Sequence, residues 1–191
     1  ITSEDESGLK DLVKALGDAS FTAEALSLMD KPEVPEDAAV VAIIGPQVSY
    51  LDAELEAVRK YLARGGRLFL ALDPGQRHNL ANLTKTLGVQ FANNFVLTMT
   101  QIAGGGPATV LGRQFDPGSE VTRSISGQSS FAIFPLVSEV KAAEDKAADL
   151  QVTEIVKSDE RSFTMTDLSQ GIKSQPQTKS VSLGVTVKSV A

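Results

Sequence analysis

Two short apolar runs, one on each side of a helical segment, constrain the fold of this chain more than any other feature. The first run, residues 40–44, is rich in β-branched residues and ends at Gly45, and the second, residues 67–72, ends at Asp73. Continuous apolar runs of this length, closed by turn residues, are typical of strands buried on both faces. We therefore expect two buried strands.

The segment between the runs has the pattern of an amphipathic helix. Its apolar stripe consists of Leu51, Leu55, Val58 and Leu62. Ser49, with Asp52 three positions later, resembles a capping box at the start. At the other end Gly65 stands where a helix C-terminus favours a left-handed residue, and Gly66 lets the chain turn with no side chain in the way. The pattern predicts a helix over residues 49–64.

Similar patterns predict the other elements of the first half. Apolar residues at helical spacing indicate helices over residues 9–16 and 80–87, with Gly17 and Gly88 just past their ends. We expect strands over residues 21–30, 89–91 and 95–97. Alternating strands and helices with short connections indicate parallel strands joined by right-handed crossovers. The predicted fold class of residues 1–103 is therefore α/β, an open and mostly parallel sheet with helices on both faces.

The second half, residues 104–191, has a different pattern of apolar residues. Few helical stripes occur in it, and we expect it to be a β-rich portion that packs on or completes the same domain. The expected strands cover residues 121–125, 130–140, 150–156 and 180–187. The stretch "KAAEDKAADL" is consistent with either a brief helix or a solvated loop. Gly104, Gly105 and Gly106 precede Pro107 and lack the lysine of a phosphate-binding loop, so we interpret them as a connector.

Composition excludes several classes of function. The net charge is −6, and no cluster of Lys and Arg could neutralise a phosphate backbone, so nucleic acid is not an expected partner. The chain has no cysteine, which removes disulfides, thiolate nucleophiles and cysteine metal sites. No apolar run approaches the roughly 20 residues that span a bilayer. We expect the chain to be an excised piece of a longer protein whose membrane anchor lies outside it.

The candidate binding residues follow the two expected strands. Ligands of open α/β sheets gather beyond the carboxyl ends of the strands, which here means Gly45, Pro46 and Gln47 after the first run and Asp73 after the second. Asp73 could act as a metal ligand or general base. An Asp before Pro-Gly is more often a turn residue that binds nearby backbone amides. We expect no cofactor and no metal.

A catalytic alternative would use His78, the only histidine, with Asp73 and a serine such as Ser49 around one crevice. No G-x-S-x-G elbow occurs in the chain, and a zinc site would usually need further His or Cys ligands. His78 is better interpreted as a surface residue at the start of a helix. No residue is therefore predicted to be catalytic.

The stretch "PEDAAVVAIIGPQVSYLDAELEAVRKYLARGGRLFLALDP" resembles the GldG-like auxiliary components of ABC transporters. In that family an apolar strand ends in Gly-Pro, a Glu-rich helix ends in Tyr-Leu-x-x-Gly-Gly, and the next strand ends in Asp-Pro. "LTKTLGVQFANNFVLT" fits the family's next element, and "SDERSFTMTDL" and "VSLGVTVKS" are weaker matches. The resemblance covers most of the chain.

The resemblance implies a fold related to class I glutamine amidotransferases, a flavodoxin-like sheet, and to a domain of intraflagellar transport proteins. It also implies a domain outside the cytoplasm, tethered by membrane helices, with no known catalytic activity. Its implied partners are an ABC permease and an ATPase, and some members serve gliding motility. The leading hypothesis is a periplasmic, non-enzymatic binding or scaffold domain. The alternatives are a hydrolase or transferase that uses Asp73 and His78, and a solute-binding domain.

Overall fold

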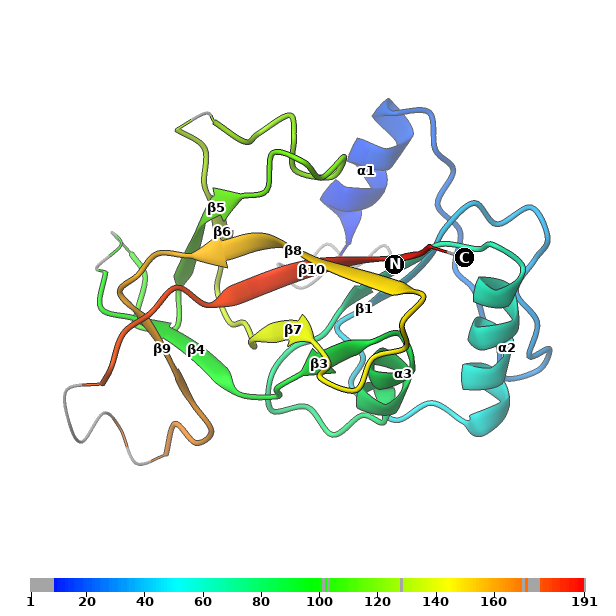
Figure 1. Ribbon diagram of the computed structural model, residues 1–191. Helices are drawn as coiled ribbons and strands as arrows, with labels where there is room; N and C mark the ends of the chain where they lie inside the picture. Colours follow the sequence, from blue (N-terminus) through cyan, green and yellow to red (C-terminus); the bar gives the residue numbers. More distant parts are fainter. Residues whose placement is uncertain are drawn as a thin grey trace. The chain divides into compact units, whose positions relative to one another are not determined.

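The computed structural model describes residues 9–100, 102, 104–127, 129–169, 171 and 176–190. Within them the chain forms three helices and ten strands (Figure 1). It divides into two compact units, one formed by residues up to Val41 with Leu51–Arg67 and the other by Ala42–Tyr50 with the residues from Leu68 onward. The predicted division at residue 103 stays a prediction.

The three helices occur where the apolar spacing predicts them. They are α1 (Lys10–Asp18), α2 (Asp52–Ala63) and α3 (Leu80–Thr86). Gly65 and Gly88 follow α2 and α3 with φ of +91° and +73°, a conformation that glycine adopts without a steric penalty. The prediction that these two glycines stop their helices is confirmed, whereas the placement of Gly17 past the end of the first helix was wrong, since it lies inside α1.

The start of α2 differs from the prediction. The N-cap is Leu51 rather than Ser49, and the carboxylate of Glu54 accepts a hydrogen bond of 2.7 Å from the Leu51 backbone N–H. Glu54 occupies the third helical position, from which a Glu side chain reaches back to the N-cap amide. This half of the capping box therefore comes from Glu54, and the pairing of Ser49 with Asp52 was wrong.

A buried tyrosine holds the end of α2. The Tyr61 side chain is 2% exposed, and its hydroxyl donates to the Ala38 carbonyl and accepts from the Arg67 backbone N–H, both at 3.1 Å. A Cβ on Gly66 would overlap the Tyr61 ring. The second glycine of the pair is therefore required by the tyrosine that packs over it, and not only by the turn.

Arg64 adds a second connection in the same unit. Its Nη2 donates to the carbonyls of Val34 at 2.7 Å and Pro35 at 2.9 Å, and its guanidinium carbon lies 5.5 Å from the centre of the Tyr61 ring. Because the segment before β1 has no regular structure, these side-chain contacts supply partners for its backbone carbonyls. The Tyr-Leu-x-x-Gly-Gly stretch thus has a structural role.

The two apolar runs form β1 (Val41–Ile44) and β2 (Leu68–Ala71), which pair with each other. The Val41 N–H donates to the Arg67 carbonyl at 2.9 Å, and the Gly45 N–H donates to the Ala71 carbonyl at 3.0 Å. Both strands advance by four residues between the two bonds, so they point the same way. Because α2 connects them along the chain, residues 41–71 follow the predicted order of strand, helix and parallel strand.

The other strands contradict the predicted fold class. They are β3 (Val89–Phe91), β4 (Phe95–Thr98), β5 (Val110–Phe115), β6 (Ala132–Phe134), β7 (Val140–Ala142), β8 (Leu150–Ser158), β9 (Ser162–Met165) and β10 (Ser182–Ser189). Four of them form a sheet in the order β10-β8-β5-β6, while β3 pairs with β7 and β4 with β9. All of these pairings are antiparallel. An open, mostly parallel, flavodoxin-like sheet was the wrong prediction.

The parallel sheet was predicted wrongly because β3 and β4 do not pair as the sequence pattern suggests. Both pair with strands from the later part of the chain and do not extend the β1–β2 pair. The β1–β2 pair also lacks the two-sided burial expected of a central parallel strand, since Ala42 is exposed and Phe69 is 55% exposed. A continuous apolar run here marks a strand with one solvent-facing side.

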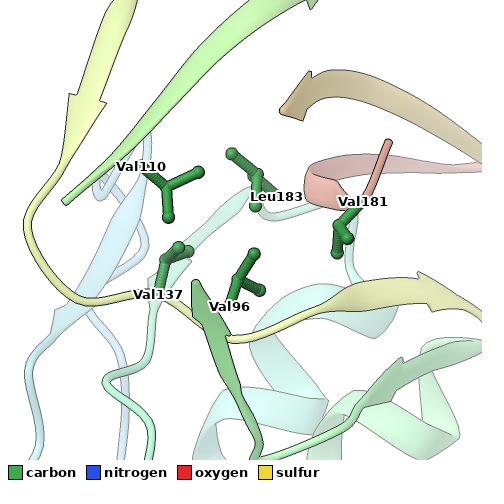
Figure 2. Packing of buried hydrophobic residues seen from close by; sticks show 5 residues of the cluster. All are labelled: Val96, Val110, Val137, Val181 and Leu183. Atoms are coloured by element: carbon green, nitrogen blue, oxygen red, sulfur yellow. The ribbon is translucent and has the colours of Figure 1, made fainter. Parts of the chain in front are cut away.

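The core of the second unit is a cluster of aliphatic side chains from separate segments. Figure 2 shows that Val96, Val110, Val137, Val181 and Leu183 point toward one another, and Phe134 and Val156 pack against them. The five buried residues come from β4, β5 and β10 and from the segments before β7 and β10, while Phe134 belongs to β6 and Val156 to β8. The cluster joins the four-stranded sheet to the β4–β9 pair, which Figure 1 shows crossing below it.

Two predicted strands are absent. Residues 21–30 form no strand, and residues 121–125 form a turn in which the Thr122 hydroxyl donates to the Asp116 carbonyl at 2.7 Å. Side chains that bond to nearby backbone compete with strand formation. The late strands predicted at 150–156 and 180–187 are confirmed as β8 and β10, and most of "KAAEDKAADL" is a loop with turns.

Candidate functional site: the loops after β1 and β2

The candidate residues after the two parallel strands do lie together. Gly45 adopts φ of +55°, and a Cβ built on it would lie 3.4 Å from Oδ2 of Asp73. The Gln47 amide Nε2 donates to the Gly45 carbonyl at 3.1 Å, and Pro46 is buried. Because parallel strands end at the same edge, the loops that follow them meet there. Because Gly45 has no side chain, the Asp73 carboxylate of the second loop lies close to the backbone of the first loop.

Two asparagines, which the sequence reasoning missed, hold these loops. The Asn79 side chain accepts from the Tyr50 N–H at 3.0 Å and donates to the Tyr50 carbonyl at 2.7 Å, so it imitates a backbone partner. Asn93 adopts φ of +50°, and its Oδ1 accepts from the Gly75 N–H at 2.9 Å. Asn is the non-glycine residue best suited to such turns, and an Asn within a predicted loop was the available signal.

Asp73 itself makes neither a hydrogen bond nor an ion pair through its side chain within the part of the chain that the structure describes. It is half-buried beside Gly45. The expected turn role, in which its carboxylate binds backbone amides, is therefore not what the structure shows. A partly desolvated carboxylate without a protein donor has unused capacity to accept hydrogen bonds from a ligand or a partner.

His78 lies just before α3, but it does not join a catalytic group. Both ring nitrogens are buried and have no hydrogen-bond partner among the described residues, and the ring centre lies 6.0 Å from that of Phe91. No hydrogen bond joins it to Asp73 or Ser49 in the described ranges. A general base needs a hydrogen bond to the group that it activates. His78 is thus half-buried beside an aromatic ring with its ring nitrogens enclosed, and it is not the surface residue that the sequence predicts.

Metal and membrane signatures give no further site. Among residues 9–100, 102, 104–127, 129–169, 171 and 176–190, no three His, Asp or Glu side chains gather as metal ligands. No helix in those same ranges has the length and apolarity to cross a bilayer.

One carboxyl group has a shifted pKa. The Ser169 backbone N–H and hydroxyl lower the pKa of the Asp167 carboxyl, which belongs to a fully exposed turn.

The stretch "SDERSFTMTDL" carries a structural turn. Oδ2 of Asp159 accepts from the Thr100 hydroxyl at 2.8 Å, and its Oδ1 accepts from the Arg161 backbone N–H at 2.9 Å. Ser158 and Ser162, on either side, are fully buried, and the Ser158 hydroxyl accepts from the Val181 N–H at 2.9 Å. These bonds connect β8 and β9 to the end of β4, so this motif holds the fold together.

The chain is similar to known proteins in its sequence family and in its fold. The family described as "ABC-type uncharacterized transport system" matches residues 2–184. A solved structure, the "mmIFT52 N-terminal domain", is similar with a TM-score of 0.67 at 19% identity, and the match covers 82% of this chain and 68% of that one. At such identity the likeness concerns the fold. No curated protein sequence matches the chain.

The family match extends from before α1 into β10, and it includes the β1–β2 pair, the Tyr61–Gly66 contact and the Asp159 turn. The predicted resemblance to auxiliary components of ABC transporters and to an intraflagellar transport domain is thus confirmed. The chain belongs to the family of auxiliary components of ABC-type transport systems.

Proposed function

We propose that this chain is an extracytoplasmic, non-enzymatic binding or scaffold domain, and that the loops after β1 and β2 form its recognition site. Asp73 carries the proposal, because its half-buried carboxylate lies against Gly45 and has no partner within the described ranges. Asn79 and Asn93 hold the two loops in place around it. A recognition site needs such a fixed frame with an unused polar group.

The non-enzymatic character is inferred from the chemistry of the same loops. The chain has no cysteine, so the nucleophile of an amidotransferase is missing. His78 packs near Phe91 with no carboxylate or hydroxyl bonded to its ring in the part of the chain described. Membership in a transport family supports a role in assembly or recognition.

The partners and the location follow from the family as proposals. The permease and the ATPase of the same transport system are the proposed partners, and membrane segments outside these residues would tether the domain. The test of location is protease treatment of intact and lysed cells that produce the full-length protein. Cleavage in intact cells, with a cytoplasmic control protein left whole, is expected. Protection until lysis would contradict an extracytoplasmic domain.

The test of recognition compares the removal of the Asp73 charge with the removal of the charge of a control aspartate. Asp73→Asn in the full-length protein should lower recovery of the complex with the permease, or transport by it, about tenfold, since a charge-assisted hydrogen bond contributes about 1.5–3 kcal/mol. Asp149→Asn is the matched control, because Asp149 is exposed in the same unit. Equal activity of both variants and the parent protein would exclude Asp73 from recognition.

A further inference from the structure

A second feature of the same unit, away from the strand-end loops in sequence, is a hollow on the four-stranded sheet. It has a volume of about 580 Å³ and lies over the end of β5, the end of β7 and the middle of β8. Small-molecule sites commonly have volumes of about 300–1,000 Å³. Its lining includes the apolar side chains of Phe115 and Val152 and the charged side chains of Asp116, Glu154 and Lys157.

An irregular strand brings two of the charges together. Residues three apart in a regular strand point to opposite faces, yet Nζ of Lys157 lies 2.7 Å from Oε2 of Glu154. The pairing of β8 with β10 shifts in this stretch, since Lys157 faces Ser182, Val156 faces Gly184 and Glu154 faces Val185. Such a bulge redirects a side chain, and bulges are over-represented beside binding sites.

The neighbouring strand accommodates this irregularity. The pairing of β5 with β8 also shifts, between Gly112 and Gln114. A Cβ on Gly112 would lie 2.7 Å from Cγ1 of Val156, so a larger residue there would have to displace the Val156 side chain. Both edges of β8 therefore depart from a regular ladder at the residues that carry the charges. The juxtaposition of Glu154 and Lys157 is built into the sheet.

The charges define which ligand fits. Two carboxylates and one ammonium leave the hollow with an excess of one negative charge. Oδ1 of Asp116 accepts from the Gly118 N–H at 3.0 Å, and its Oδ2 has no partner among the described residues. The Lys157 and Glu154 side chains are 41% and 35% exposed, so both can be reached from solvent. An ammonium group complements the carboxylates, and a carboxylate complements Lys157.

We propose that this hollow binds a small solute that carries an ammonium group, with a net charge of zero or above, and that a free amino acid is the fitting class. The ligand ammonium binds between Asp116 and Glu154, its carboxylate binds Lys157, and its aliphatic part contacts Phe115 and Val152. The site uses none of the residues of the β1–β2 loops, so it is independent of the function proposed above.

The experiment titrates the purified chain with three probes of similar length, L-lysine, cadaverine and glutarate, and follows backbone amide resonances by NMR. L-Lysine should bind most tightly, cadaverine more weakly because it lacks the carboxylate, and glutarate not at all. The shifted resonances should belong to the end of β5 and to β8. Equal binding of glutarate, no response to any probe at millimolar concentration, or shifts confined to other strands would overturn the proposal.

Substitutions test the contributions of Glu154 and Lys157 one at a time. Glu154→Gln should weaken binding of both L-lysine and cadaverine about tenfold, and Lys157→Met should remove the preference for L-lysine over cadaverine. Lys85→Met is the matched control, because Lys85 forms an exposed ion pair with Asp145 at 3.2 Å elsewhere in the unit. If a variant loses the dispersed spectrum of a folded chain, the proposal is judged from the parent chain alone, by whether its ligand-induced shifts map to the end of β5 and to β8. Unchanged affinities in folded variants would overturn the assignment.

Discussion

The β1–β2 pair and the four-stranded sheet are built from strands with different relations to the sequence. β1 and β2 are four residues long and are joined directly through α2. The sheet β10-β8-β5-β6 unites strands spread from Val110 to Ser189, and its aliphatic cluster draws on four separate stretches of the chain. Phe69 on β2 is 55% exposed, whereas Val110 on β5 is fully buried. Local sequence can specify the first region, while the second forms only when segments distant in sequence pack together.

The largest expected effect comes from the aliphatic cluster. Leu183→Ala should lower the free energy of unfolding by about 3 kcal/mol, because it removes buried methyl groups and leaves a cavity. Chemical denaturation measures it. Val190→Ala, at a residue 58% exposed just after β10, is the control and should change stability little. Equal effects of the two substitutions would break the comparison between the regions.

The next effect concerns the end of α2. Gly66→Ala should cost about 2 kcal/mol, because the added Cβ overlaps the ring of Tyr61 and overpacking strains the neighbours. Gly17→Ala is the matched control, since a Cβ on Gly17 meets no atom within 4 Å and alanine favours a helix. The two substitutions should therefore shift the denaturation midpoint in opposite directions. A stabilising Gly66→Ala would show that the tyrosine does not require the glycine.

Tyr61→Phe tests the hydrogen bonds of the same residue and should cost about 1.5 kcal/mol. The ring stays, but the Ala38 carbonyl and the Arg67 N–H lose their shared partner. Calorimetric unfolding measures the change. In a Gly66→Ala background the cost should shrink, because the ring is already displaced. Strictly additive losses would mean that the glycine and the hydroxyl act separately.

The smallest expected effect is at the strand-end loops. His78→Leu should leave the free energy of unfolding within about 1 kcal/mol of the parent value, since the buried ring nitrogens make no hydrogen bond among the described residues and leucine is an apolar residue of similar size. Thermal unfolding measures it. A hydrolase screen on the same variant bears on the catalytic alternative, because turnover by the parent chain that disappears in His78→Leu would favour it.

Much of the local structure and part of the site could be predicted. Spacing of apolar residues located α1, α2 and α3, and the rule for parallel strands brought Gly45 and Asp73 together. The strand expected at 21–30 failed because an apolar composition does not create a pairing partner. Asn79 was missed because its role is visible only when Tyr50, 29 positions earlier, is seen beside it.

The sequence by itself determined the helices, the glycine stops of α2 and α3, and the parallel β1–β2 pair, because each depends on spacing and turn chemistry within a short stretch. Only the tertiary structure decided that β3 and β4 pair with β7 and β9, that β8 is irregular at Glu154 and Lys157, and that the Asp73 side chain has no bonding partner among the described residues. Antiparallel partners distant in sequence are selected by which faces can be buried together, and that choice is made by the whole chain at once.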